Sequence, residues 1–365
     1  MRIALIHPVY WPEVHRGSER IVNDIGRRMA ARGHEVTLIT SHRGRSSASH
    51  EDGMRVLRGR RPRRLPGMGL YELFLETVPG AAWQLLRGGY EAAHAFHLSS
   101  AVAAALARRG GGPPFAYSFH GIPTRTYLTA RRRRIEMLRL SIEAAAAVTV
   151  LSEAAAQVMR RHLLTDPELL PAGVDLSAFA PGPEREPEPM ILYPASFTDP
   201  RKRAGLLLEA FAELRRERRQ ARLVLADNPD PAIGGGRPRL PEGARWADLN
   251  APGALEEAYR RAWVTALPSV DEAQGLVLLE SLASGTPFVA ARSGAPPQIH
   301  GGRQGVGRLF DPDDRAALVR ALGEALDLAA SDGTRAACLD RAAGYSWQRL
   351  EPAHEDLYLR LAEAA

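Results

Sequence analysis

The sequence predicts an α/β protein in which two parallel sheets form separate domains. Its 365 residues are enough for two domains that each bury a core. Apolar runs alternate with segments of helical periodicity, which is the pattern of strand–helix–strand units. A Pro-rich, charged segment at residues 181–189 is typical of an extended hinge between domains.

The first domain is expected to cover residues 1–180. It opens with a strand at 2–7, a helix over 21–31 that Gly33 ends, and a strand at 35–40. Further strands are expected within 90–97, 115–121 and 146–152, and helices over 101–108 and within 122–142.

Two segments of this domain are less regular. Residues 41–66 are polar, basic and turn-rich, so we expect an exposed excursion there. Residues 70–86 are expected to form a helix. Four of its side chains are candidates for burial or for contact with a ligand, and a core role is favoured for each: Leu73, Phe74, Val78 and Trp83.

The second domain is expected to cover residues 190–350. Its predicted strands are 190–195, 223–226, 263–267 and 288–291, and its predicted helices are 204–215, 255–263, 275–283 and a helix that ends at Leu328. The Gly-rich residues 228–241 are expected to form a loop, which lacks the G-K-[ST] of a P-loop.

The most informative stretch is residues 268–290, which lies between two of these strands. A ligand belongs at the carboxyl end of such a strand, where the next helix begins. The free N–H groups of Gly275, Leu276 and Val277 would point outward there. The stretch therefore predicts a phosphate site.

Two carboxylates frame this predicted site. Glu272 precedes the helix, and Glu280 follows about two turns inside it. An acid next to a phosphate site repels phosphate, so its partners are expected to be neutral donors such as sugar hydroxyls. The combination indicates a sugar nucleotide. The alternative is that Glu272 is a charge favoured by the helix dipole and Glu280 a solvated helix residue.

Two cations and a histidine are further candidates. Arg201 and Lys202 lie just ahead of the 204–215 helix and would add positive charge to its N-terminus. His120 lies at the carboxyl end of a strand, where it could donate to a sugar hydroxyl or, when protonated, contact a phosphate. His94 and His97 are expected to be structural.

Composition and charge bear on which other classes of protein and partner are expected. The net charge is +6, and Arg residues cluster at 58–64 and 131–134, but no aromatic residues interleave with them, so no nucleic-acid partner is expected. Compositional bias explains the clusters equally well. No apolar run is long enough for a membrane span, and the first residues lack the pattern of a signal peptide, so a cytoplasmic protein is expected. Cys338 is the single cysteine, which excludes an internal disulfide.

Several sequence motifs resemble those of one protein family. E-A-Q-G-L-V-L-L-E-S-L-A-S-G-T-P-F-V-A at residues 272–290 is similar to the E-x7-E signature of the retaining family-4 glycosyltransferases of GT-B fold. The resemblance continues through R-G-H-E-V-T-L-I-T, L-P-A-G-V-D-L-S-A-F-A-P and L-L-L-E-A-F, and covers nearly the whole chain. The chain departs from the family's phrases at Ser18, Ala172, Ala273, Gln274 and Gln298, and has Gly121 where the family has an acid.

The resemblance implies a fold and a set of roles. It implies two Rossmann-like domains that face each other across a cleft, with a last helix, about 351–365, crossing back onto the first domain. It implies that Glu272 and His120 hold the transferred sugar and that Lys202 neutralises the diphosphate. Arg201 either substitutes for the family's phosphate-binding Arg or faces solvent. The remaining donor-binding residues that it implies are Gly17, Ser18, Ser196, Trp246, Ala247, Gly275, Leu276, Val277 and Glu280.

The expected function is transfer of a sugar from a nucleoside diphosphate sugar to a small-molecule acceptor, a secondary metabolite among the candidates. Retention at the anomeric carbon is implied by the resemblance. No D-x-D motif for a metal is evident, so no cofactor or metal is expected. The alternatives are a membrane-associated enzyme with a lipid-linked acceptor, docking through residues 122–142, and a non-catalytic sugar-nucleotide-binding module. The sequence leaves the nucleotide, the acceptor and the oligomeric state open.

Overall fold

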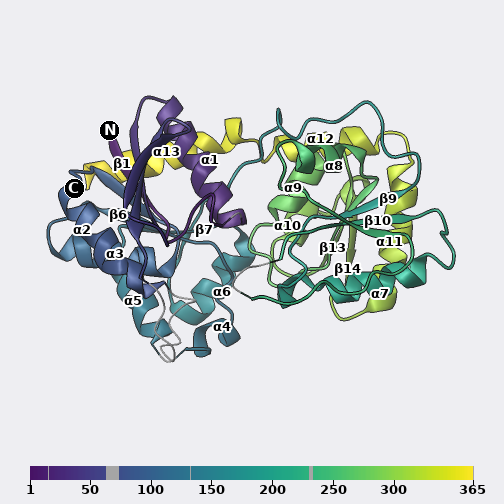
Figure 1. Cartoon of the computed structure of the whole chain (residues 1–365), viewed down its shortest axis with the longest axis horizontal. Helices are drawn as coiled ribbons and strands as arrows, with labels where there is room; N and C mark the ends of the chain where they lie inside the picture. The colour runs from purple at the N-terminus through teal and green to yellow at the C-terminus, as the bar shows by residue number, and fades with distance from the viewer. Residues whose placement is uncertain (15, 63–73, 132, 230–232, 365) are drawn as a thin grey trace. The chain divides into compact units, whose positions relative to one another are not determined.

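The computed structural model describes residues 1–14, 16–62, 74–131, 133–229 and 233–364. Contacts divide the chain into two compact units (Figure 1). One unit is Met1–Ala172 together with Leu350–Ala365, and the other is Gly173–Arg349. Each unit has a hydrophobic core of its own, built around a sheet.

The sheet of the first unit has the strand order β3-β4-β2-β1-β5-β6-β7-β8 in its described part. Neighbouring strands are parallel, except that β3 runs antiparallel to β4. The strands are β1 Arg2–Ile6, β2 Glu35–His42, β3 Ser47–Glu51, β4 Met54–Arg60, β5 Ala92–Ala95, β6 Phe115–Phe119, β7 Ala147–Val150 and β8 Glu168–Leu169.

Helices connect these strands, and side chains cap several of them. The helices are α1 Gly17–Ala31, α2 Val78–Arg87, α3 Leu98–Arg109, α4 Arg125–Thr129, α5 Arg134–Ala144 and α6 Glu153–Leu163. His97 accepts the Ser99 N–H and so caps the Ala-rich α3, and Ser152 caps α6 in the same way. The predicted alternation of strands and helices is therefore confirmed, with α1 beginning four residues before the predicted 21.

The prediction of an exposed excursion over residues 41–66 was wrong for its central part. Residues 47–60 form β3 and β4, and β4 is a parallel neighbour of β2 in the sheet. Met54, Val56 and Arg58 alternate on the buried face of β4. Arg58 can be buried because its guanidinium donates to both carboxylate oxygens of Glu51, at 2.7 and 2.8 Å. Residues 63–66 lie outside the described residues.

The predicted helix over residues 70–86 is shorter in the structure. A 3₁₀ turn, Leu75–Thr77, leads into α2, and Leu73 lies outside the described residues. Phe74 and Val78 are buried as predicted. Trp83 is 54% exposed, so a core role for it was wrong; its ring lies 4.2 Å from the Arg87 guanidinium carbon.

The segment considered for membrane docking packs its apolar side inward. Leu128 of α4 and Leu138 of α5 are buried in the core, and Tyr127, Ile135 and Met137 pack against it. Arg134 is also buried, with its guanidinium carbon 4.1 Å from the Tyr127 ring centroid. The alternative of a helix packed on the core is confirmed for these residues.

The sheet of the second unit has the order β11-β10-β9-β12-β13-β14 and is parallel throughout its described part. Its strands are β9 Met190–Tyr193, β10 Arg222–Ala226, β11 Ala244–Ala247, β12 Val264–Leu267, β13 Phe288–Ala291 and β14 Gly307–Phe310. Its helices are α7 Ala204–Leu214, α8 Ala254–Arg261, α9 Leu276–Ala283, α10 Pro296–His300, α11 Arg315–Ala329 and α12 Thr334–Ala343.

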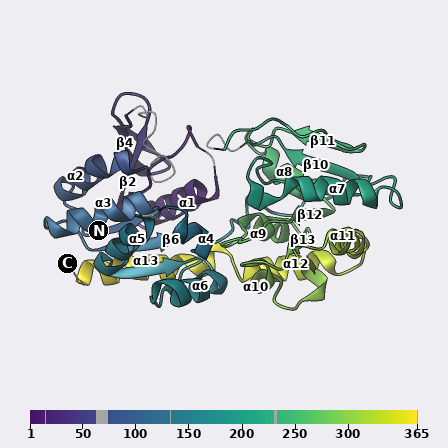
Figure 2. The ribbon, with the colours of Figure 1, turned by 90° about the horizontal axis from the view of Figure 1, so that it is seen from below.

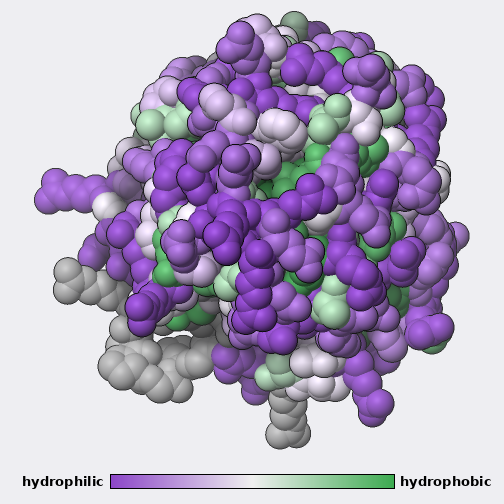
Figure 3. Space-filling model, turned by 90° about the vertical axis from the view of Figure 1, so that its right-hand side faces the viewer, coloured by the Kyte–Doolittle hydropathy of each residue, from purple (hydrophilic) through white to green (hydrophobic). Residues whose placement is uncertain are grey.

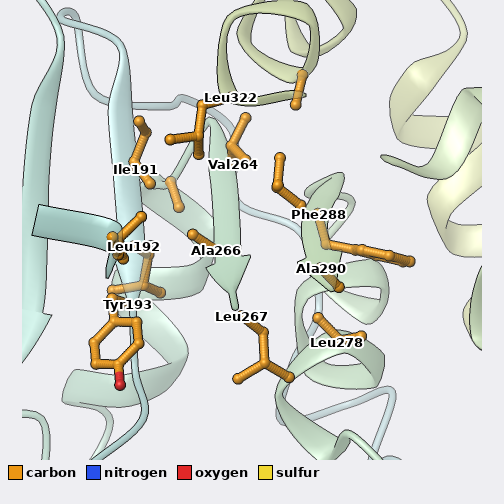
Figure 4. Packing of buried hydrophobic residues seen from close by; sticks show 14 of the residues in the cluster. Ile191, Leu192, Tyr193, Val264, Ala266, Leu267, Leu278, Phe288, Ala290 and Leu322 are labelled. Atoms are coloured by element: carbon orange, nitrogen blue, oxygen red, sulfur yellow. The ribbon is translucent and has the colours of Figure 1, made fainter. Parts of the chain in front are cut away.

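The core of this unit lies between the sheet and its helices. Figure 4 shows Ile191, Val264 and Phe288 from three neighbouring strands packed with Leu322 of α11 and Leu278 of α9. These apolar strands are buried on both faces, as expected of a parallel sheet. Hydrophilic side chains cover most of the outer face that Figure 3 shows, with hydrophobic ones between them.

Residues 173–189 belong to the second unit in the contact division, although residues 173–180 were expected in the first domain and 181–189 in a free hinge. The Glu186 N–H donates to the Arg261 carbonyl at 2.9 Å, and the Trp263 indole N–H donates to the Glu186 carbonyl at 2.7 Å. These bonds attach the Pro-rich segment to the end of α8 and the start of β12.

The last helix, α13 Trp347–Glu363, belongs to the first unit from Leu350 onward. Figure 2 shows it as the yellow helix that runs along that unit. Tyr358 of α13 contacts His94 of β5, with the hydroxyl 2.8 Å from Nδ1, and His354 contacts the Pro171 carbonyl. The helix α13 therefore packs with residues of the first unit and contributes to that unit's core.

Candidate active site

Both sheets have a topological switch point where ligands of parallel sheets bind. In the second unit, β10 lies on one side of β9 and β12 on the other. In the first unit, β2 and β5 flank β1 in the same way. Because the connections leave the carboxyl ends of these central strands in opposite directions, a crevice forms there. The candidate residues follow these strand ends in each unit.

The loop after β9 carries the cations of the second unit. The Tyr193 hydroxyl lies 3.0 Å from the Ser196 carbonyl and 3.2 Å from the Lys202 carbonyl, so it holds both ends of this loop. A 3₁₀ turn, Pro200–Lys202, follows, and the Asp199 carboxylate caps it by accepting the Arg201 N–H at 3.0 Å. The backbone of Lys202 is therefore fixed before any ligand binds.

Lys202 and Glu272 form an ion pair across the switch point. The Lys202 ammonium donates to Glu272 Oε2 at 2.6 Å, and the two side chains are only 21% and 14% exposed. Burial by itself would raise the pKa of the Glu272 carboxyl. The Lys202 charge and hydrogen bond, with Arg201 and the Gly275 N–H, outweigh burial and hold this pKa below its usual value. Glu272 is therefore a carboxylate at neutral pH.

The backbone around Glu272 is held by the segment after β13. The Ala295 N–H donates to the Glu272 carbonyl at 2.8 Å, and Ser293 Oγ accepts the Asp271 N–H at 3.0 Å. Gly294 packs against Glu272, and a Cβ at this glycine would lie 2.7 Å from Glu272 N and still closer to its carbonyl oxygen. The position of the Glu272 carboxylate thus depends on a glycine 22 residues later in the chain.

The helix α9 begins at this carboxylate. Gly275 is its N-cap, with a φ of +79°, and the Gly275 N–H bonds to Glu272. Leu276 and Val277 follow in the first turn, where N–H groups have no partner within the helix. The structure places these three residues and Glu272 together, as predicted, and their contacts with a ligand stay a prediction.

Glu280 lies inside α9 and is buried, with 3% exposure. Its Oε2 accepts a hydrogen bond from the Tyr259 hydroxyl at 2.7 Å. The alternative that Glu280 is a solvated helix residue was therefore wrong. Its predicted contact with a ribose stays a prediction.

The other predicted donor-binding residues of this unit also lie at strand ends. Trp246 and Ala247 end β11, and the Trp246 ring lies 4.7 Å from the Phe197 ring, centroid to centroid. Ser196 Oγ lies 3.3 Å from Thr198 Oγ1. Arg201 pairs with Asp199 at 2.7 Å and its side chain is 59% exposed, while its charge still contributes to the lowered pKa of Glu272.

In the first unit, the Ser18 hydroxyl joins two histidines. Ser18 lies in the first turn of α1, directly after Gly17, at which the helix begins. Its Oγ lies 2.8 Å from His120 Nδ1 and 3.1 Å from His7 Nε2. His7 follows β1, and His120 follows β6. The predicted residues Ser18 and His120 are therefore in direct contact.

His120 has a lowered pKa. Burial is the largest cause, and with the smaller effects of nearby His7 and His354 it lowers the pKa of His120 to about 3. A role for protonated His120 at a phosphate is therefore not available, while hydrogen bonding to a hydroxyl is. His94 lies between Tyr358 and Ser118, and His97 caps α3, which are the structural roles predicted for both.

Several residues of these sites were missed by the sequence analysis. His7 follows a strand just as His120 does, so the same signal could have identified it. Glu19 is fully buried in the first turn of α1, where Arg16 donates to it at 3.1 Å. The roles of Tyr193, Tyr259 and Gly294 depend on tertiary contacts and have no local signal.

The described residues were also considered as ligands of a metal ion and as parts of a membrane span. Among the described residues, no group of three His, Cys, Asp or Glu side chains is arranged to hold a metal ion. No helix in the described part of the chain is both long enough and apolar enough to span a membrane.

Comparisons with known proteins give family matches in both units. Residues 15–178 match the model described as Glycosyltransferase Family 4, and residues 188–327 match Glycosyl transferases group 1. A D-inositol 3-phosphate glycosyltransferase of Geodermatophilus obscurus is 30% identical over 315 residues, which are 76% of this chain and 68% of that protein. D-inositol 3-phosphate glycosyltransferase 2 of Catenulispora acidiphila is 32% identical over 214 residues, 52% of this chain and 50% of that protein. The chain spans about half the length of this relative and of those from Corynebacterium jeikeium and Kineococcus radiotolerans.

Solved structures agree with the observed fold. Sucrose-phosphate synthase from Thermosynechococcus elongatus has a TM-score of 0.86 at 24% identity, with 100% of both chains covered. Anabaena HepE in complex with UDP has a TM-score of 0.70 at 15% identity, again with 100% of both chains covered. At these identities the likeness concerns the fold. Together with the relative from Geodermatophilus obscurus, these findings show that the chain belongs to glycosyltransferase family 4 and has the GT-B fold.

Proposed function

We propose that the chain transfers a sugar from a nucleoside diphosphate sugar to a small-molecule acceptor, with retention and without a metal ion. The observation that carries this proposal is the ion pair of Lys202 and Glu272 at the switch point of the second sheet. A fixed cation suits a phosphate group, and a fixed carboxylate suits sugar hydroxyls. Both groups lie next to the start of α9, whose N–H groups favour an anion.

Different parts of the donor molecule would contact different residues of this site. The diphosphate would contact Lys202 and the N–H groups of Leu276 and Val277, which stabilise the charge that grows on the leaving group. Glu272 would accept hydrogen bonds from the transferred sugar. For His120, the family resemblance implies contact with a sugar hydroxyl. Glu280 would hold the ribose by exchanging its bond from Tyr259 for a ribose hydroxyl, and Trp246 and Ala247 would border the base.

The course of the proposed reaction is the one that the family resemblance implies. The bond between the anomeric carbon and the diphosphate oxygen breaks, and a bond from the acceptor oxygen to that carbon forms on the same face of the sugar. The acceptor proton passes to the leaving phosphate oxygen, so no separate base is required. Lys202 lowers the barrier because it contacts the diphosphate most strongly when the negative charge has moved onto it.

The acceptor is proposed to be a small hydroxylated molecule. Relatives are named as D-inositol 3-phosphate glycosyltransferases, and structural neighbours as sucrose-phosphate and trehalose-6-phosphate synthases. The inward packing of Leu128 and Leu138 argues against a membrane-bound acceptor reached through α4 and α5. We would therefore screen cyclitol phosphates and hexose phosphates before lipid-linked sugars.

Two substitutions test the proposed roles. Glu272→Ala should lower kcat about 100-fold or more while nucleotide affinity changes little, because the carboxylate acts on the sugar. Lys202→Ala should weaken nucleotide binding and lower kcat, because the ammonium acts on the diphosphate. Arg218→Ala is the matched control, since it removes an exposed ion pair with Asp327 of the same unit and should leave both quantities unchanged.

Nucleotide binding gives a direct test of the donor class. Thermal unfolding with UDP, GDP, ADP and dTDP, each with and without a chelator, should show stabilisation by one nucleotide that the chelator does not remove. The stabilisation is about 2.7 kcal/mol at a ligand concentration of a hundred times Kd. Binding without turnover of any donor would favour the non-catalytic module. A shift that the chelator abolishes would contradict the metal-free site.

A further inference from the structure

Ser18 does more than begin α1. The contacts of His7 determine in which direction the Ser18 hydroxyl donates its hydrogen bond. His7 Nδ1 lies 2.6 Å from the Val9 carbonyl oxygen. A carbonyl only accepts hydrogen bonds, so His7 Nδ1 carries a proton. In a neutral imidazole the other nitrogen then has a lone pair, and His7 Nε2 is an acceptor.

The Ser18 hydroxyl must therefore donate to His7. Ser18 Oγ lies 3.1 Å from His7 Nε2 and has a single proton. With that proton directed to His7, Ser18 Oγ can only accept from His120 Nδ1, which lies 2.8 Å away. The opposite direction would place a lone pair of Ser18 against the lone pair of His7 Nε2 and would lose one of the two bonds.

We infer that the relay from the Val9 carbonyl through His7 and Ser18 fixes His120 as the tautomer with a proton on Nδ1 and a lone pair on Nε2. Among the described residues, no hydrogen bond reaches His120 Nε2. His120 Nε2 is therefore available as an acceptor for a ligand. Ser18 and His7 are positioning residues, because they act on a ligand only through His120.

The relay requires His7 to be neutral. Burial lowers the pKa of His7, and the Arg16 charge lowers it further, while Glu19 and the Val9 carbonyl raise it by a smaller amount. The titratable or charged groups that face His7 are Glu19 at 4.0 Å, Arg16, and the rings of His97 and His120. An imidazolium at His7 would keep the bond from Nδ1 to the Val9 carbonyl but would reverse the two hydrogen bonds of Ser18, because His7 Nε2 would then donate.

This inference rests on the proposed function where it concerns the donor, and there it determines which sugars fit. An acceptor nitrogen binds a hydroxyl that donates a hydrogen bond, and it repels a carboxylate. The relay therefore selects neutral hexoses over hexuronic acids at the position that faces His120. It also gives a reason for the hydroxyl at residue 18, where the family's phrase has a glycine and no relay could form.

The tautomer can be measured without any substrate. Two-bond ¹H–¹⁵N correlation spectra of the full chain with ¹⁵N-labelled histidine distinguish the two neutral forms, and His120→Gln identifies the His120 signals. We expect a protonated Nδ1 and an unprotonated Nε2 on His120 at pH 7.5. His7→Phe frees the Ser18 hydroxyl to donate to His120, so the tautomer should invert, while Ser18→Thr should preserve it.

Two results would overturn the relay. One is a proton on His120 Nε2 in the unaltered chain. The other is a His120 tautomer that stays the same in Ser18→Gly and in His7→Phe, with both variants folded by circular dichroism. If His7→Phe does not fold, Ser18→Gly together with Ser18→Thr still decides the matter, because Thr keeps the hydroxyl and Gly removes it.

Donor analogues test the consequence for substrate choice. Replacing the hydroxyl that faces His120 by fluorine removes its proton, so kcat/KM should fall about 3- to 10-fold, as expected for one hydrogen bond. This penalty should shrink in His7→Phe and persist in Ser18→Thr. Equal penalties in all three proteins would overturn the role in specificity. If no donor is turned over at all, the proposed function is contradicted. The relay can still be tested in that case, because the tautomer spectra need no substrate.

Discussion

The position of the Glu272 carboxylate depends on Gly294. Gly294 has a φ of +77°, and a Cβ there would overlap the backbone of Glu272. We expect Gly294→Ala to displace the Glu272 loop and to lower kcat about 100-fold, since displacements near 1 Å have such effects. The measurement is steady-state transfer, with nucleotide affinity by calorimetry to show that Lys202 still binds.

The control for this change is Gly302→Ala. Gly302 has a φ of +72°, and nothing lies within 4 Å of its Cβ position. Both substitutions carry the backbone cost of a left-handed alanine, about 1 kcal/mol, and both should lower the free energy of unfolding by at least that amount. Equal activities of the two variants would show that Gly294 does not position Glu272.

These residues also show what the sequence could predict. The spacing of Glu272 and the α9 start follows from strand and helix periodicity, so the sequence placed both after β12, where the structure has them; ligand binding there stays a prediction. Lys202 was found because it precedes a helix. Gly294 acts through a contact with a residue 22 positions away, and no local pattern encodes a neighbour at that distance.

The β3–β4 hairpin was predicted incorrectly because its charges were taken as a sign of exposure. Arg58 can be buried because Glu51, on the neighbouring strand of the same hairpin, forms an ion pair with it. Burial of charge therefore depends on strand register, which polar composition does not reveal. The Trp83 error is of the opposite kind, since an aromatic residue on a helix was assumed to face the core.

The hairpin can be tested at Arg58. Arg58→Met keeps the apolar stem and removes the guanidinium, leaving Glu51 with the Ser49 hydroxyl as its remaining side-chain donor. We expect a loss of about 2 kcal/mol in the free energy of unfolding, as for a hydrogen-bonded charge. Arg55→Ala, on the exposed face of the same strand, should change this free energy by less than about 0.5 kcal/mol. Urea titration gives both values.

The effect of Arg58→Met should depend on pH in a defined direction. Hydrogen bonds from Arg58 lower the pKa of Glu51 below the usual 4.5 despite partial burial. A lowered pKa in the folded state adds stability above the unfolded pKa, and this stability is lost as the pH falls through the folded value. The difference between the two proteins should therefore be constant at pH 6–8 and shrink below about pH 4. A difference that grows in acid would contradict the assignment.

At the scale of the whole molecule, the chain forms two hydrophobic cores. The C-terminal helix α13 contributes side chains to the core of the first unit and so affects that unit's stability. The segment from Leu350 belongs to the first unit, where Leu357, Tyr358 and Leu361 are almost fully buried. The resemblance to a known family implied this return, whereas periodicity alone gave only a helix. Which core a terminal helix joins is a long-range property, so the sequence pattern could not specify it.

Tyr358 tests this dependence. Tyr358→Ala removes a buried ring and leaves His94 without a partner at Nδ1, so we expect a loss of about 3 kcal/mol in the first unit. Tyr358→Phe removes the hydroxyl alone and should cost about 1 kcal/mol. Hydrogen exchange of the full chain should become faster in β5 and β6 for Tyr358→Ala, while β9 and β12, which belong to the other core, keep their protection. Equal acceleration in all four strands would show that the two cores unfold as one, and the nucleotide affinity of the second unit would then fall as well.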